Sequence, residues 1–218
     1  SIGRVLDRLD KHGIADNTIV VFMNDNGGGG STGLYAGHSR NYANNKPLRG
    51  HKFDVLEGGV RVPLIIRWPK RAPAGKVYRE MVSSTDVFPT LVAGAGLRMP
   101  KGQPTDGVDL LPFINGKNSS NPHEWLCWQN RSWFPRQKGG YGVPAPKVHN
   151  SAIRKGNWKL VRMNEKIGSD DPPPTWQLYD LKNDIGEQKD LAKQHSKVVK
   201  ELGDQFNKWR SSMHPTVE

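Results

Sequence analysis

The first third of the chain contains one apolar pattern with helical spacing and two that resemble strands. Apolar residues at positions 2, 5, 6 and 9 predict an amphipathic helix that ends near Gly13. Residues 18–23 are continuously apolar and β-branched, and a glycine-rich loop follows them, so we expect a buried, central parallel strand of an α/β sheet. Residues 60–68 predict a second buried strand, in which Pro63 indicates an irregularity or an edge position. Because the helix stands at the very start of the sequence, we expect a chain cut at a helix boundary.

The middle of the chain carries fewer regular patterns. Residues 84–86 are helix-capping types, and they precede an apolar helical face formed by Phe88, Leu91, Val92 and Ala95. Proline and glycine punctuate residues 97–150, which predicts an irregular surface segment anchored by the apolar residues 107–114.

The C-terminal part predicts a small α+β subdomain. Residues 152–154 and 158–163 flank a turn and predict an antiparallel hairpin, and residues 176–181 predict a third short strand. A final amphipathic helix places one apolar stripe on its surface: Val199, Leu202, Phe206, Trp209 and Met213. We therefore expect two domains, an α/β core over residues 1–125 and the subdomain over residues 126–218.

Composition narrows the classes of function. The 218 residues carry a net charge of +11, which favours an anionic substrate. The basic residues are scattered without interleaved aromatic residues, which argues against nucleic acid. The sequence contains no run of 18 apolar residues, the length that would predict a membrane-spanning helix. The single cysteine, Cys127, cannot form an internal disulfide, and we expect it to be a small buried hydrophobe.

Asp25 and Asn26 follow the first predicted strand directly. Open α/β sheets bind ligands at the carboxyl ends of their strands, and carboxylate and amide oxygens suit Ca²⁺ or Mg²⁺ better than zinc. The same residues could instead form an Asx turn or a hairpin turn. A hairpin is disfavoured because no alternating strand follows the loop. The later Lys52 and Glu57-Gly58-Gly59 complete a pattern that favours a hard-cation site over a turn.

The next segment supplies candidate anion-binding residues. Lys52 could act as a compact positive charge against an anionic ligand, although any one lysine is more often solvated. We expect His51 to line a substrate pocket and Arg49 to hold its own loop by hydrogen bonds. Arg61 is predicted to form a structural ion pair, with Glu57 as the candidate partner.

Two further features have competing interpretations. His38 follows the predicted cation site and is a candidate for substrate binding, whereas a lone histidine in a polar loop is more often simply exposed. The aromatic residues between positions 125 and 134 could form a binding rim, but we expect them to belong to a core.

Several segments together resemble the sulfatase family, which hydrolyses sulfate esters. They are residues 17–27, 47–63, 84–91, 106–111, 152–161 and 178–188. The resemblance implies an α/β fold: an incomplete alkaline-phosphatase/sulfatase-like sheet with a C-terminal α+β subdomain, made of a small antiparallel sheet and a packing helix. It also implies that Asp25 and Asn26 complete a Ca²⁺ shell, with Mg²⁺ as a substitute, and that Lys52 contacts the sulfate group.

The resemblance also implies what these residues lack. Sulfatases carry a formylglycine nucleophile made from Cys or Ser in a Cys/Ser-x-Pro-x-Arg motif, and Cys127 is followed by Trp128 and Gln129 instead. We therefore expect the C-terminal portion of an arylsulfatase-type enzyme, inactive by itself, whose whole protein takes aryl or carbohydrate sulfates. The family implies a periplasmic, secreted or lysosomal location.

Two other functions fit the same residues. One is a phosphodiesterase or phosphonate hydrolase of the same superfamily, and the other is a non-catalytic basic module that binds sulfated glycans. An exposed half-sheet would also allow self-association through a strand edge.

Overall fold

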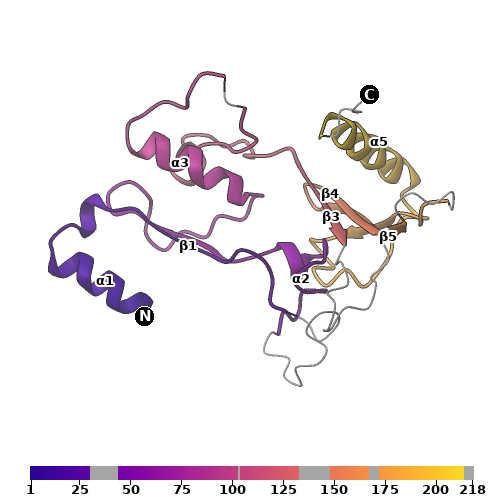
Figure 1. Cartoon of the computed structure of the whole chain (residues 1–218), viewed down its shortest axis with the longest axis horizontal. Helices are drawn as coiled ribbons and strands as arrows, with labels where there is room; N and C mark the ends of the chain where they lie inside the picture. Colours follow the sequence, from indigo (N-terminus) through magenta and orange to yellow (C-terminus); the bar gives the residue numbers. More distant parts are fainter. Residues whose placement is uncertain (30–43, 103, 133–147, 167–171, 214–218) are drawn as a thin grey trace, which may run out of the picture. The chain divides into compact units, whose positions relative to one another are not determined.

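The computed structural model forms two compact units (Figure 1). Unit 1 comprises Ser1–Met23 and Pro63–Glu124, and unit 2 comprises Asn24–Val62 and Trp125–Glu218. The structure describes residues 1–29, 44–102, 104–132, 148–166 and 172–213.

Unit 1 combines short helices with a two-stranded ribbon. Its elements are α1 (Ile2–Lys11), the 3₁₀ turn η1 (Ala15–Asn17), β1 (Val20–Met23), β2 (Leu64–Arg67), the 3₁₀ turn η2 (Ser84–Asp86), α3 (Val87–Gly94) and α4 (Leu111–Ile114). The helices predicted at the start of the chain and after residue 84 are thus present. Among the described residues, no helix has the length and apolar character needed to cross a membrane.

The ribbon corrects the predicted strand arrangement. β1 and β2 pair antiparallel, with Val20 opposite Arg67 and Met23 opposite Leu64, whereas we expected a parallel strand. The second strand begins only at Leu64, because Pro63 before it has no N–H to donate to a ladder. The strands are also less buried than predicted: Phe22 and Ile65, which lie opposite each other, are 38% and 59% exposed. A ribbon that has only two strands within the described residues leaves much of its surface uncovered.

The start of α3 is fixed by a buried carboxylate. Asp86 accepts the backbone N–H of Ser83 at 2.7 Å and that of Val108 at 2.9 Å, and both its oxygens lie 2.9 Å from His123 Nε2. Thr90, one turn further, accepts the N–H of Leu110 at 2.9 Å. These bonds attach residues 107–111 to the helix, as the predicted anchor requires.

Unit 2 contains a four-stranded antiparallel sheet in the order β3-β4-β5-β6. Its strands are β3 (Trp125–Ser132), β4 (Val148–Lys155), β5 (Trp158–Lys166) and β6 (Gln177–Asp180), and its helices are α2 (Glu57–Val60) and α5 (Ser196–Met213). The predicted hairpin, third strand and final helix are confirmed. β3 was not predicted, and Glu57–Val60 is a helical turn where we expected the second strand to begin.

The sheet of unit 2 buries both faces. On one face, Ile153, Leu160 and Leu178 pack with Leu202 and Phe206 of α5. The opposite face contributes Ala152, Val161 and Tyr179, which pack with Val55 and Leu56 just before α2. Since successive strand residues face opposite sides, one sheet holds a helix on one side and the segment around residue 55 on the other.

The aromatic residues of β3 belong to these cores, as expected. Trp128 packs against the cluster that contains Val55, and Trp125 and Cys127 pack against the cluster that contains Phe206. Burial raises the pKa of the Cys127 thiol to about 12, which fits a structural role for this side chain. Trp133 and Phe134 lie outside the described residues.

The two units divide the chain differently from the predicted domains, residues 1–125 and 126–218. The described residues between Asn24 and Val62, together with Trp125, belong to the unit that holds the C-terminal sheet, although β1 and β2 belong to unit 1. All the candidate site residues that the structure describes therefore lie in one unit.

Candidate functional site

The predicted cation ligands lie in a bend that follows β1. Asp25 is exposed and Asn26 is half-buried. The Asn26 N–H donates to Asp25 Oδ1 at 3.0 Å, which orients the carboxylate toward the next residue's backbone. An Asx turn would use the N–H of the residue two positions on instead. Within the described residues, no cluster of three or more His, Cys, Asp or Glu side chains could hold a metal by itself.

A second loop, which carries Lys52, lies beside this bend. The Gly27 N–H donates to the Gly59 carbonyl at 2.9 Å, and the Lys52 N–H donates to the Gly28 carbonyl at 3.0 Å. Asn45 joins both loops, because its side chain accepts from the Gly28 N–H and donates to the carbonyls of Gly28 and Gly50. The backbone of Lys52 is thus hydrogen-bonded to the residue two positions after Asn26.

The close approach of the two loops depends on glycine. A Cβ atom on Gly27 would lie 1.7 Å from the Gly58 carbonyl oxygen, and one on Gly58 would lie 2.3 Å from the Gly50 carbonyl oxygen. Both neighbours are backbone atoms, which cannot move aside as a flexible side chain can. Gly27 is therefore required for the backbone contact that joins the loops, and Gly58 for the close approach of α2 to Gly50 within the second loop.

Lys52 and His51 of the second loop contact neighbours in the sequence. Lys52 Nζ lies 5.4 Å from the centroid of the Phe53 ring. His51 Nδ1 is 2.8 Å from the Lys52 carbonyl oxygen and 3.5 Å from Asp54 Oδ2. The proposed pocket-lining role of His51 stays a prediction, and His38 lies outside the described residues.

A buried charge cluster attaches this loop to the C-terminal sheet. Lys159 Nζ lies 2.8 Å from Glu57 Oε1 and 3.1 Å from Glu187 Oε1, and all three side chains are almost completely buried. Glu187 Oε2 also accepts the backbone N–H of Glu57 at 2.8 Å. The predicted Arg61–Glu57 ion pair is confirmed at 3.3 Å.

The two carboxylates in this cluster differ in acidity. Burial would raise the pKa of Glu57, but the positive charges of Lys159, Arg154 and Arg61 outweigh it, so this pKa lies below its ordinary value. Burial raises the pKa of Glu187, and the attraction of Lys159 offsets this only in part. Both carboxylates share Lys159, but Glu57 also has two arginines nearby. The added positive charge explains why the pKa of Glu57 is lowered while that of Glu187 is raised.

Arg49 provides a second attachment for the loop. Its Nη1 atom donates to the Tyr179 hydroxyl at 3.1 Å and to the Glu187 carbonyl at 2.8 Å. This confirms the expectation that Arg49 holds its loop by hydrogen bonds. In addition, the Asn130 side-chain amide of β3 donates to the carbonyl of Phe53, the residue after Lys52.

Sequence reasoning did not identify Lys159, Tyr179 or Glu187. The available signal was strand alternation: Lys159 shares a sheet face with Val161 and pairs in register with Tyr179, so it points to the same side as apolar core residues. A charged residue at an inward-facing position requires a buried partner of opposite charge.

Comparison with known proteins shows relatives along the whole chain. A family model named Sulfatase matches residues 1–97, and one described as "N-sulphoglucosamine sulphohydrolase, C-terminal" matches residues 51–212. The steryl-sulfatase of Mus musculus is 33% identical over 240 residues, which cover 100% of this chain and 36% of the relative. The N-acetylgalactosamine-6-O-sulfatase of Bacteroides thetaiotaomicron is 29% identical over 217 residues, which cover 94% of this chain and 38% of the relative.

Comparison with solved structures also finds a similar fold. The crystal structure of Ps i-CgsB in complex with k-i-k-neocarrahexaose superposes with a TM-score of 0.71 at 33% identity, covering 95% of this chain and 40% of that one. The chain therefore spans well under half the length of the relatives it matches. Its mixed α/β architecture, with the four-stranded antiparallel sheet and α5, is that of the C-terminal part of the alkaline-phosphatase-like fold. This chain belongs to the sulfatase family.

Proposed function

We propose that this chain supplies part of the cation-binding and sulfate-binding site of a sulfuric-ester hydrolase. Asp25 and Asn26 provide oxygen ligands for Ca²⁺, and Lys52 provides the positive charge that contacts the sulfate group. The observation that carries the proposal is the pair of backbone hydrogen bonds from Gly27 to Gly59 and from Lys52 to Gly28, which joins the two loops.

The donor set fits Ca²⁺ in kind but not in number. Ca²⁺ takes about six to eight oxygen ligands, and Mg²⁺ about six. One carboxylate and one amide carbonyl supply at most about three, so these residues can complete a shell but cannot build one. When bound, such a cation acts as a Lewis acid and stabilises negative charge on sulfuryl oxygens.

The residues around the site position it rather than react. The cluster of Glu57, Lys159 and Glu187 holds the loop of Lys52 against a rigid sheet, as does Arg49 through Tyr179. A lysine on a fixed loop can keep its charge near one position in space, which favours binding of an anion. His51 and His38 are proposed to contact the remainder of the substrate, which we expect to be an aryl or carbohydrate sulfate.

Within this proposal the isolated chain hydrolyses nothing. It contains no Cys/Ser-x-Pro-x-Arg motif from which a formylglycine could be made, so no residue provides the nucleophile. An assay with a chromogenic aryl sulfate and Ca²⁺, repeated with an aryl phosphonate, should give no turnover. If the chain did hydrolyse a substrate, and Lys52→Ala abolished that turnover, the proposed inactivity would be wrong.

Binding tests the site itself. Calorimetric titration of the full chain with Ca²⁺ should show weak binding that Asp25→Ala reduces severalfold. Asp7→Ala, which removes an exposed carboxylate from α1, is the matched control and should leave binding unchanged. With Ca²⁺ present, Lys52→Ala should weaken binding of inorganic sulfate more than Lys117→Ala does. Equal effects of test and control variants would contradict the proposal.

A further inference from the structure

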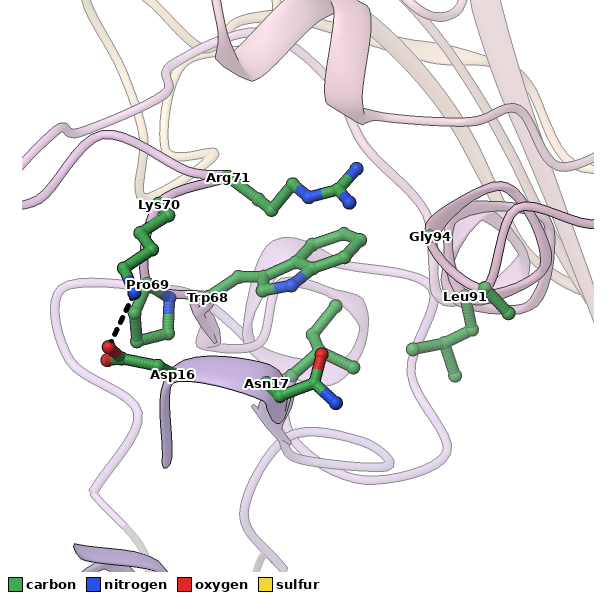
Figure 2. A pocket seen from close by; sticks show the side chains of 10 residues that line it. Asp16, Asn17, Trp68, Pro69, Lys70, Arg71, Leu91 and Gly94 are labelled. Atoms are coloured by element: carbon green, nitrogen blue, oxygen red, sulfur yellow. Dashed lines mark ion pairs between the residues drawn. The ribbon is translucent and has the colours of Figure 1, made fainter. Parts of the chain in front are cut away.

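A pocket of about 630 Å³ lies within unit 1 (Figure 2). Three segments form it: residues 16–19 before β1, residues 68–71 after β2, and the last turn of α3. Pockets that bind small molecules occupy roughly 300–1,000 Å³. The residues that line it all belong to unit 1, whereas Asp25 and Lys52 belong to unit 2.

One wall of the pocket is a fixed aromatic ring. A Cβ atom on Gly94 would lie 2.2 Å from Trp68 Cη2, so the indole rests directly on the backbone of α3. Only 8% of Trp68 is exposed. Its carbonyl accepts the N–H groups of Arg71 and Ala72 at 3.1 and 2.9 Å, which closes a tight turn around the ring. The wall is therefore preorganised, and its ring orientation costs little on binding.

The polar groups of the pocket carry excess positive charge. Lys70 Nζ pairs with Asp16 Oδ2 at 2.8 Å, as the dashed line in Figure 2 marks, so those charges offset each other. Arg71 is exposed, and its guanidinium lies 5.8 Å from the Trp68 ring centroid. Among the described residues, Arg71 forms no ion pair with a carboxylate, and the Asn17 side-chain amide forms no hydrogen bond.

These three side chains face the same space. In Figure 2 the Asn17 amide, the Trp68 ring and the Arg71 guanidinium all extend toward α3, where Leu91 lies. The Trp68 ring, 8% exposed, offers an apolar edge to part of a sugar rather than a stacking face. An amide suits hydroxyl groups, and a guanidinium suits a sulfate or carboxylate. We propose that this pocket binds a sugar unit that carries an anionic group, as a second carbohydrate site that includes neither Asp25 nor Lys52.

The test is titration of the full ¹⁵N-labelled chain, followed through the indole N–H resonance of Trp68. Trp68→Phe assigns that resonance. The probes are N-acetylglucosamine 6-sulfate, glucuronic acid, neutral N-acetylglucosamine and inorganic sulfate. The sulfated sugar or the uronic acid should shift the resonance saturably, and whichever binds more tightly identifies the anionic group. The neutral sugar and inorganic sulfate should bind more weakly, because each lacks half of the recognised features.

Matched variants separate a specific site from general attraction. Arg71→Ala should weaken binding of the anionic sugar about tenfold, because it removes the charged hydrogen-bond donor. Arg79→Ala removes the same charge from an exposed position outside the pocket and should leave the affinity unchanged. The proposal is overturned if no probe gives a saturable shift, if inorganic sulfate binds as well as the anionic sugars, or if both variants weaken binding equally.

Discussion

Lys159 Nζ lies 2.8 Å from Glu57 Oε1, and both side chains are buried, although 102 residues separate them in the sequence. Glu57 begins α2 in the loop region that carries Lys52, and Lys159 lies on β5 of the C-terminal sheet. This ion pair therefore couples the position of the candidate sulfate-binding loop to the folding of the C-terminal sheet.

Loss of Lys159 should destabilise unit 2 strongly. Lys159→Met leaves Glu57 and Glu187 buried without the cation they share, which we expect to cost about 3–5 kcal/mol in the free energy of unfolding by urea. Lys200→Met is the control, since the Lys200–Asp204 pair on α5 is exposed, and it should cause no measurable change. Adding Glu57→Gln to Lys159→Met should recover part of the loss. An equal loss in the two lysine variants would contradict the role of the cluster.

The two carboxylates of the cluster should give pH dependences of opposite sign. The pKa of Glu57 in the folded state lies below its ordinary value of 4.5, so its contribution to stability is present above pH 4.5 and is lost as the pH falls through the folded value. The pKa of Glu187 is raised above 4.5, so its contribution is present below pH 4.5 and is lost as the pH rises through the raised value.

Urea unfolding of the wild type and two variants across this range measures both effects. Glu57→Gln should flatten the loss of stability on the acid side of pH 4.5. Glu187→Gln should flatten the decline on the other side. Parallel curves for all three proteins would show that neither carboxylate changes its pKa on folding.

Substitution of Gly27 should separate the two site loops. Gly27→Ala places a methyl group 1.7 Å from the Gly58 carbonyl oxygen, and we expect a loss of about 1–3 kcal/mol from the overpacked backbone. Gly29→Ala is a close control, because a Cβ atom there has no neighbour within 4 Å in the part of the chain that the structure describes. It should change stability by less than about 0.5 kcal/mol.

Hydrogen exchange locates the effect. The Lys52 amide, bonded to the Gly28 carbonyl, should exchange faster in Gly27→Ala and at the wild-type rate in Gly29→Ala. Unchanged exchange in both variants would mean that the loops do not depend on this glycine contact.

Cys127 should resist thiol reagents while the chain is folded. With its pKa raised to about 12 by burial, about one molecule in 10,000 carries the thiolate at pH 8, and the thiolate is the reactive form. Labelling with a chromogenic disulfide should be slow in buffer and fast in urea. Rapid labelling of the folded chain would show that the β3 thiol is accessible.

Local patterns in the sequence predicted the elements whose stability depends on neighbouring residues. The 3.6-residue spacing of apolar residues gave Ile2–Lys11, Val87–Gly94 and Ser196–Met213 as helices, and strand alternation around a short turn gave the β4–β5 hairpin. β3 was missed because its proline- and glycine-rich surroundings predict a loop, and its partner β4 begins only at Val148.

The direction of the β1–β2 pairing was also beyond local patterns. An apolar run shows that a segment can form a strand, but the path of the chain between Met23 and Leu64 decides whether the pairing is parallel or antiparallel. In the same way, local sequence predicts that Lys159 is a solvated lysine. Only the folded position of β5 places it beside Glu57.

The sequence by itself determined the family and the candidate residues Asp25, Asn26 and Lys52, because chemical type and order along the chain are enough to recognise a motif. Only the tertiary structure decided how the loop of Lys52 is held. Its attachments are a buried ion pair across 102 residues, the bonds of Arg49 to Tyr179 and Glu187, and a backbone crossing that depends on glycine. Such contacts join residues that are distant in sequence, and their strength comes from burial, which exists only once the chain has folded.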